Sequence, residues 1–309
     1  MLAIFLQTLP FFALIGLGYG AGRTGFFTPE ATAWLTKFVF YFALSAMIFC
    51  FAANLPVAEL FDPAFIAAYL SGTMAVYLLA TAVALIRRRG VAEAAVEAQC
   101  AAIGNTGFLG IPMLAVLLGE AAVGPVMMVL AVDLIVFSSL IVILVTGSRE
   151  GRLSPAILGT VALGLVKNPM IVSIVLGLCW SAFRLPLPEP AAMFLVLLGA
   201  AATPGALFAI GASLAARSVE RLAVAGWLSF AKLVLHPAAV AFCALVLFDV
   251  LPYAAGVMIA AAALPVAGNV YMLAQHYGVA PQRVSASILI STAASILTVP
   301  AVIALIATL

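Results

Sequence analysis

Long apolar runs, separated by short polar connections, occupy almost the whole of this 309-residue chain. We predict ten spans of about 20 residues, the length that an α-helix needs to cross a bilayer. They lie at residues 2–22, 29–53, 63–86, 93–119, 122–146, 168–184, 189–216, 220–248, 252–278 and 282–308. The sixth is short, and residues 154–166 are expected to form its helical lead-in. Runs this long exclude barrel strands, so the sequence predicts an all-α membrane protein with ten transmembrane helices.

The composition excludes a water-soluble fold. Hydrophobic residues make up 66% of the chain and charged residues 8%, whereas about 25% of residues are charged in soluble proteins. The sequence has no nucleotide-binding loop, no hydrolase or zinc-protease motif, and no cysteine pair at metal-ligand spacing. We therefore expect neither an enzyme nor an ATP-driven pump. We also expect no cofactor, no metal and no nucleic-acid partner, with the lipid bilayer as the surroundings.

Basic residues predict the orientation, because loops rich in Lys and Arg stay on the cytoplasmic side. If both termini lie outside, one arginine, Arg184, falls in an outer loop, beside the acidic residues Glu59, Asp62, Glu120, Glu189 and Asp249. The inner loops then carry Arg23, Arg87, Arg88, Arg89, Arg149, Arg152, Arg217, Arg221 and Arg283. Glu93 and Glu97 flank the inner end of the fourth span, where we expect a solvated pairing with the arginines at 87–89 at the membrane interface.

Two segments far apart in the chain read as copies of one another. Residues 110–119 align with residues 269–278, and four of the ten pairs are identical. Each segment follows a cluster of helix breakers and amides, Gly104-Asn105-Thr106-Gly107 in the first and Pro265-Val266-Ala267-Gly268-Asn269 in the second. Interrupted spans at corresponding places in two halves are the best sequence indication of a transporter's binding site.

Five spans in each half turn the second half upside down relative to the first. We therefore predict an inverted repeat of residues 1–146 and 168–309, joined by a cytoplasmic connector at 147–167. The fourth and ninth spans would then break and cross near the middle of the membrane. Each restarting helix has unpaired N–H groups and a positive dipole end there, and two such ends favour an anion.

Polar residues at the two breaks are the candidates for binding that anion. Asn105 and Asn269 are expected either to cap the restarting helices or to donate their amide groups to a substrate carboxylate. The prolines at the breaks remove backbone donors, and their alternative role is a kink without function. The predicted binding set at the breaks is Gly104, Asn105, Thr106, Pro112, Pro265, Gly268, Asn269 and Tyr271.

Four ionisable side chains, Lys37, Asp133, Lys232 and His236, fall well away from the ends of predicted spans. A charge near the membrane centre costs about 2.5–3.5 kcal/mol or more, so it usually has a partner or a task. His236 follows Lys232 by one helical turn on the same face. Asp133 is expected either to form a structural ion pair with a lysine or to serve proton coupling or charge balance. The sequence leaves both alternatives open.

Five motifs in order give the chain its family resemblance. They are Asn105-Thr-Gly-Phe-Leu-Gly-Ile-Pro112, Lys167-Asn168-Pro169, Thr203-Pro204-Gly-Ala-Leu207 with Gly211-Ala-Ser-Leu214, Lys232-Leu-Val-Leu-His236-Pro237, and Leu264-Pro-Val-Ala-Gly-Asn-Val-Tyr271 with Leu273-Ala-Gln-His-Tyr277. In these motifs the chain resembles the auxin efflux carrier family, which includes plant PIN auxin transporters and bacterial permeases for malonate and malate. The resemblance covers essentially the whole length.

The resemblance implies a fold akin to that of bile-acid symporters, with a scaffold domain and a transport domain that holds the two broken helices. It implies that Asn105 contacts the substrate carboxylate and that Pro265 is a crossover proline. Two positions depart from the family. Gly104 replaces a proline of the plant members, and Ser45 replaces a proline of many relatives. We expect both changes to reshape the binding site, so Ser45 joins the candidate set.

We therefore expect a secondary active transporter of small organic anions, such as malonate or malate, that works by elevator-like alternating access in a bacterial inner membrane. An exporter of auxin-like aromatic acids is one alternative, and a non-transporting receptor or assembly subunit is another. The lysines within the spans favour a dicarboxylate substrate. The coupling ion is expected to be H⁺ or Na⁺, and a homodimer is left open.

Overall fold

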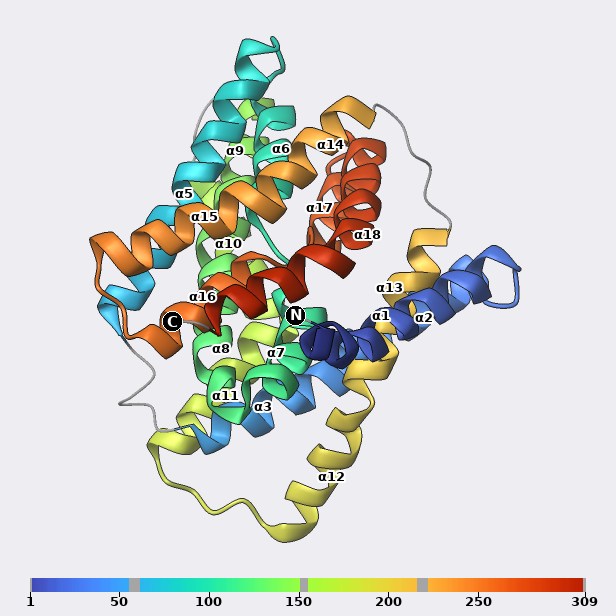
Figure 1. Cartoon of the computed structure of the whole chain (residues 1–309), viewed down its shortest axis with the longest axis vertical. Coiled ribbons are helices and arrows are strands. Elements are labelled where there is room, and N and C mark those ends of the chain that lie inside the picture. The colour runs from blue at the N-terminus through green and yellow to red at the C-terminus, as the bar shows by residue number, and fades with distance from the viewer. Residues whose placement is uncertain (1, 56–61, 151–154, 216–221, 308–309) are drawn as a thin grey trace.

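The computed structural model describes residues 2–55, 62–150, 155–215 and 222–307, and every regular element in these ranges is a helix (Figure 1). Seven helices of this part of the chain are long and apolar enough to cross a membrane. They are Ile4–Arg23, Pro29–Asn54, Pro63–Ile86, Glu120–Arg149, Glu189–Ala215, Leu222–Leu247 and Pro281–Ile306. The predicted all-helical membrane protein is confirmed. Glu59, Arg152, Arg217 and Arg221, used above for the orientation, lie outside the described residues.

Most of the long helices are built from consecutive segments. Three are single elements: α1 (Leu2–Arg23), α5 (Pro63–Ile86) and α18 (Pro281–Ile306). The others are α2 (Pro29–Phe38), η1 (Val39–Ala43) and α3 (Leu44–Asn54); η3 (Glu120–Ala122), α8 (Val123–Val132), η4 (Asp133–Phe137) and α9 (Ser138–Glu150); α12 (Glu189–Ala200) and α13 (Ala202–Ala215); and α14 (Leu222–Phe230), η5 (Ala231–Leu235), α15 (His236–Phe242) and η6 (Cys243–Leu247). All these η segments except η3 are π turns, which are frequent at functional sites.

Three further apolar segments are bent or interrupted. α10 (Pro155–Lys167) and α11 (Pro169–Ala182) meet at an angle of 67°. α6 (Val91–Ala102) is separated from η2 (Thr106–Gly110) and α7 (Ile111–Leu118) by residues 103–105. α16 (Pro252–Ala262) is separated from α17 (Gly268–His276) by residues 263–267. The two interruptions fall at the two clusters of Gly, Pro and Asn in the sequence.

The two interruptions contact one another. Gly104 and Val266 form an isolated antiparallel bridge. On either side of it, the N–H of Asn105 donates to the carbonyl of Pro265 at 2.8 Å, and the N–H of Ala267 donates to the carbonyl of Ile103 at 3.1 Å. Extended backbone at membrane depth is tolerated only where such groups are paired inside the protein. The predicted meeting of two broken helices is confirmed.

Matching glycines follow the two restarted helices. Gly119 comes directly after α7 with φ +92°, and Gly278 lies two residues beyond the end of α17 with φ +62°. Glycine reaches such angles without the steric cost that a side chain adds. These are the two final residues of the aligned sequence segments, so the similarity extends to a positive φ at the last residue of each.

The helices fall into two groups by their packing (Figure 1). In the first group, called the frame bundle, α1 packs along α13, and α3 packs along α11 and α12. The second group, called the core bundle, contains α5, α6, α8, α9, α14, α15, α16 and α18. The α1–α13 contact is close: a Cβ on Gly211 would lie 1.9 Å from the carbonyl oxygen of Ile15, and one on Gly18 would lie 2.1 Å from that of Phe208.

Candidate functional site

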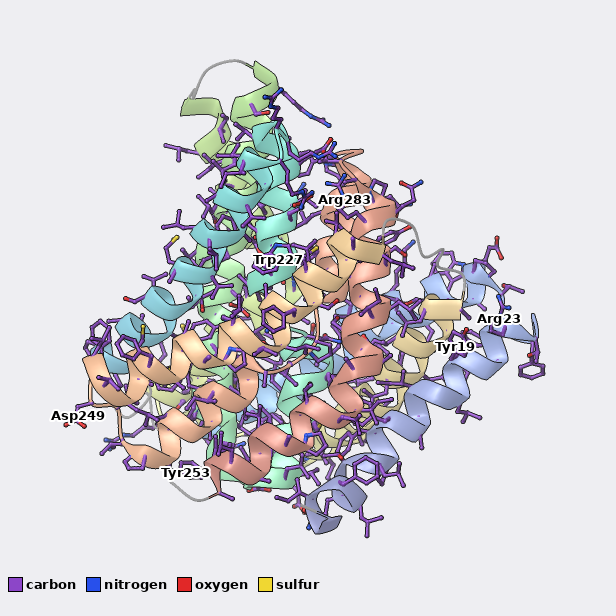
Figure 2. All side chains as sticks on the ribbon, turned by 45° about the horizontal axis from the view of Figure 1, so that its top comes forward. Tyr19, Arg23, Trp227, Asp249, Tyr253 and Arg283 are labelled. Carbon is purple, nitrogen blue, oxygen red and sulfur yellow. The ribbon has the colours of Figure 1, made fainter. Side chains whose placement is uncertain are left out.

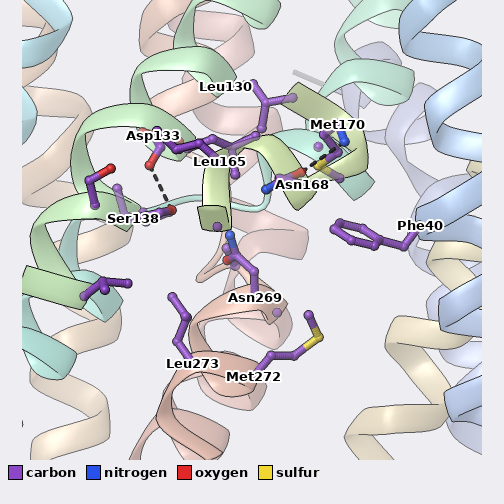
Figure 3. Close-up of a pocket in the computed structure, with 18 of the residues that line it drawn as sticks. Phe40, Leu130, Asp133, Ser138, Leu165, Asn168, Met170, Asn269, Met272 and Leu273 are labelled. Carbon is purple, nitrogen blue, oxygen red and sulfur yellow. Dashed lines mark hydrogen bonds between the residues drawn. The ribbon is translucent and has the colours of Figure 1, made fainter. Parts of the chain in front are cut away.

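A cavity of about 420 Å³ lies against both interruptions (Figure 3). Its volume is many times the ~30 Å³ that one water occupies in the liquid, so it can hold a small molecule with its hydration. Of the predicted site residues it is lined by Gly104, Asn105, Asp133, Gly268 and Asn269. Residues of η1, α10 and α11 also line it.

Asn105 presents a free amide to this cavity. The residue is 6% exposed, and it precedes η2 at the N-cap position without a side-chain cap bond. Its backbone is fully used, because its carbonyl accepts from Leu109 and Gly110 while its N–H donates to Pro265. Among the described residues the amide has no partner. The amide atoms are not among the fully buried, unpartnered side-chain atoms of the described residues, so they are accessible from the cavity and suited to a ligand.

Asn269 lies beside Asn105 on the cavity wall, but not at the predicted cap. The N-cap of α17 is Ala267, and Asn269 is the second residue of the helix. Its Oδ1 atom is buried, and no partner for it occurs in the described ranges. The first N–H groups of α17 have no acceptors within the helix, so this end carries a positive potential.

The other predicted binding residues lie behind the cavity wall. Thr106 directs its hydroxyl to Asp133 Oδ2 at 3.4 Å. Pro112 and Pro265 are buried at the start of α7 and within the second interruption, where they shape the backbone. Ser45 donates to the carbonyl of Phe40 at 3.1 Å, inside the π turn that borders the cavity. Tyr271 is half-buried on α17 and does not line the cavity.

A buried polar network connects the cavity to both interruptions. The hydroxyl of Tyr69 donates to Asp133 Oδ1 at 2.8 Å. Lys232 lies across from this pair with 0% exposure, and its Nζ donates to the carbonyl of Ala262 at 2.5 Å. That carbonyl belongs to the last turn of α16, where a cation offsets the negative helix end. The chain therefore satisfies the C-terminus of a broken helix with its own ammonium group.

His236 completes the network. Its Nδ1 lies 3.0 Å from Lys232 Nζ, and its Nε2 lies 2.9 Å from the hydroxyl of Thr73. The predicted pairing of Lys232 and His236 on one helical face is confirmed. No direct ion pair joins Asp133 and Lys232 in the described part of the chain.

Lys37 lies apart from the cavity. The side chain is exposed, and its Nζ sits 4.4 Å from the centre of the Trp34 ring. Trp34 is itself 68% exposed, which is the pattern of a lysine and an aromatic ring at a membrane surface. Of the two lysines expected to balance charge, only Lys232 is near the interruptions.

Sequence reasoning missed several residues of the cavity. The rings of Phe40 and Phe108 stack with centroids 6.0 Å apart at 7°, and both line the cavity. Asn168 lies at the joint of α10 and α11, and His276 lies at the end of α17. The Asn-Pro pair at 168–169 is a helix-start signal that could have drawn attention to Asn168. Phe108 lies within the first family motif but is absent from the predicted binding set, and nothing local in the sequence marks Phe40 as its partner.

The predicted pairing of Glu93 and Glu97 with nearby arginines is confirmed, but the expected solvated setting is wrong for Glu97, which is buried. Arg87 holds Glu97 through two hydrogen bonds of 3.1 and 2.9 Å, and Arg89 lies 3.9 Å from Glu93. Arg283 of α18, labelled in Figure 2, contacts both carboxylates, at 3.1 Å from Glu93 and 2.5 Å from Glu97. Glu97 is 1% exposed, so its ion pairs link α6 to α18 and to the C-cap of α5 through a buried carboxylate.

Two interrupted helices that meet at a cavity with amide side chains on its wall, inside an integral membrane protein, define a membrane transporter. The chain belongs to the membrane transport protein family, whose model matches residues 3–303. It is 36% identical over 307 residues to a Rhizobium meliloti (strain 1021) protein named "Putative malonate transporter", covering 96% of this chain and 94% of the relative. The resemblance to the auxin efflux carrier family is confirmed, and the protein is a transporter rather than an enzyme.

Proposed function

We propose that this protein is a secondary transporter of small organic anions, with malonate-like or malate-like carboxylates as substrates. The observation that carries the proposal is the amide of Asn105, which is buried, unpaired among the described residues, and placed where the two interruptions meet. The similarity to a protein named for malonate supports the substrate class. Asn105 and Asn269 would hold a carboxylate, with Gly104 and Gly268 allowing its close approach to the backbone.

The remaining candidate residues support the carboxylate-binding residues from positions that do not line the cavity. Thr106 positions Asp133, and Pro112 and Pro265 hold the interruptions open. Ser45 fixes the π turn that carries Phe40. Tyr271 would orient the α17 wall. None of these supporting residues needs to touch the substrate to affect its binding.

The proposed architecture is ten spans in two inverted halves. The seven long helices, the bent pair α10–α11 and the two interrupted segments correspond in order to the ten predicted spans. The repeats would be residues 1–146 and 168–309, with a connector at 147–167. The antiparallel contact of the interruptions and the positive φ of both Gly119 and Gly278 support this relationship.

We assign coupling to the network around Asp133. An anion about 4 Å from an ionised carboxylate would meet a repulsion of roughly 4 kcal/mol at an effective dielectric constant of 20. The groups facing Asp133 are Tyr69 from α5, Thr106 from η2 and the more distant Lys232 from η5. Protonation of Asp133 as substrate binds would remove the repulsion. This favours H⁺ over Na⁺ as the coupling ion, with Lys232 and His236 balancing the remaining charge.

Alternating access would carry the core bundle past the frame bundle, in an elevator-like motion. From the interruptions the cavity extends along α9, α10 and α17 to His276 and Tyr277. Arg149 donates to the carbonyl of Tyr277 at that end. The proposed orientation, with both termini outside in a bacterial inner membrane, makes this the cytoplasmic side. The structure would then represent an inward-facing state.

An exporter of auxin-like aromatic acids is the second candidate, because Phe40 and Phe108 give the cavity a stacked aromatic wall. Uptake by purified protein in proteoliposomes separates the two. We expect accumulation of radiolabelled malonate that Asn105→Ala reduces about tenfold or more, as loss of a hydrogen bond to a charged group implies. The matched control is Asn54→Ala, because Asn54 is exposed and caps its own helix. Flux of indole acetate alone would favour the second candidate, and no flux of any acid would indicate a receptor.

A further inference from the structure

Asn168 places a third helix N-terminus on the cavity wall. It is the N-cap of α11, and its Oδ1 accepts from the N–H of Met170 at 3.0 Å. Its backbone is also used, because its N–H donates to Leu165 at 3.1 Å and its carbonyl accepts from Val172 at 3.0 Å. Asn168 and Met170 both line the cavity.

The cap bond fixes how the Asn168 amide is turned. With Oδ1 committed to α11, the NH₂ group points the other way, and its two N–H donors remain. Figure 3 shows the amides of Asn168 and Asn269 both directed into the cavity, from different elements. Within the described ranges no side chain or carbonyl accepts from this NH₂ group.

The donors of the cavity therefore come from two bundles. Asn105 and Asn269 belong to the interruptions, whereas α11 packs along α3 in the frame bundle. That the cavity takes a polar ligand is indicated independently by the Asn105 amide, which is 6% exposed and unpaired in the described part of the chain. A ligand with one carboxylate could accept hydrogen bonds from one of these two sets of donors, whereas a ligand with two carboxylates could accept from both.

We propose that Asn168 is a specificity-determining residue that selects dicarboxylates. One carboxylate is held at the interruptions by Asn105, and the second accepts a hydrogen bond from Asn168 Nδ2 at the N-terminus of α11. The inference rests on the proposed function, because it names the substrate class of the same site. It also predicts that a dicarboxylate bridges the two bundles in this state.

Binding of malonate and propionate to the purified full-length protein tests this, since the two ligands differ by one carboxylate. Asn168→Ser keeps an N-cap oxygen but removes the NH₂ group. We expect it to weaken malonate binding about tenfold or more and to leave propionate within twofold. Asn105→Ala should weaken both ligands. Asn168→Asp is the second variant; it also keeps the cap, and it should weaken malonate further by adding a negative charge.

Melting temperatures without ligand check that each variant is folded. Equal loss of malonate and propionate binding in Asn168→Ser, or no loss of either, would overturn the role of Asn168. In that case binding of both acids by the unaltered protein would leave the proposed function standing. If the unaltered protein bound neither acid, both the proposed function and this inference would fail.

Discussion

The backbone N–H of Asn105 donates a 2.8 Å hydrogen bond to the carbonyl oxygen of Pro265, across the two halves of the chain. This bond and its neighbour from Ala267 to Ile103 pair backbone groups that the interruptions would otherwise leave without partners. Each unsatisfied group within a membrane costs several kcal/mol. Each interruption is thus satisfied in part by the other and in part by side chains such as Ser291, whose Oγ accepts from the N–H of Val266 at 3.1 Å. The positions of the site residues depend on these contacts.

Gly104→Ala should impair transport by crowding the crossing. Its Cβ would lie 3.2 Å from Lys232 Nζ and 3.3 Å from the carbonyl of Ala261, closer than ordinary contact. We expect a several-fold loss of uptake and a destabilisation of about 1–3 kcal/mol, as for other overpacked sites. Gly226→Ala is the control, because nothing lies within 4 Å of its Cβ position. Uptake and thermal unfolding measure both effects, and unchanged uptake in Gly104→Ala would refute tight packing at the crossing.

Asp133→Asn should remove the pH dependence of transport. A proton on Asp133 removes the negative charge beside the anion, so uptake by the unaltered protein should rise as the pH falls on the side where substrate enters. Asparagine is neutral at every pH, so the variant should show a flat profile. Initial uptake rates measured across a pH series provide the readout, with the exposed Glu120→Gln as the control. A variant that keeps the full pH response would assign coupling elsewhere.

Glu97→Gln should destabilise the fold more than Glu93→Gln. Glu97 is 1% exposed between Arg87 and Arg283, and removing its charge leaves the buried Arg283 paired with the more exposed Glu93. Breaking a buried ion pair costs up to about 3–5 kcal/mol. Glu93 is 38% exposed, so its loss should cost less than about 1 kcal/mol. Thermal unfolding in detergent compares the two, and equal melting temperatures would contradict the burial of the Glu97 pair.

Much of the fold could be predicted from the sequence, because membrane helices satisfy their own backbone and their length follows from the bilayer. The breaks were also predictable, since Gly and Pro act locally. The helix start near Asn269 was not. Ala267 is the cap because its N–H bonds to Ile103 in the other half, which holds residue 267 in extended conformation. The sequence around residue 267 alone does not show that Ile103 is its hydrogen-bond partner.

The site residues divide in the same way. Lys232 and His236 could be paired from their spacing, because one helical turn brings them together whatever surrounds them. The contact of Glu97 with Arg283 and the place of Asn168 on the cavity wall depend on how distant helices pack. Lys37 was wrongly placed near the site for the same reason. Its position along a span does not show whether its side chain faces the lipid or the protein interior.

The glycine contact between α1 and α13 has a mechanical consequence. Gly18 and Gly211 bring the two backbones so close that even a methyl group would collide with the opposite chain. A slide of one helical turn, about 5.4 Å, would bring larger side chains into these places. The first and seventh predicted spans are therefore expected to move together as one rigid unit during the transport cycle. The displacement that carries a solute across would then come from the other helices.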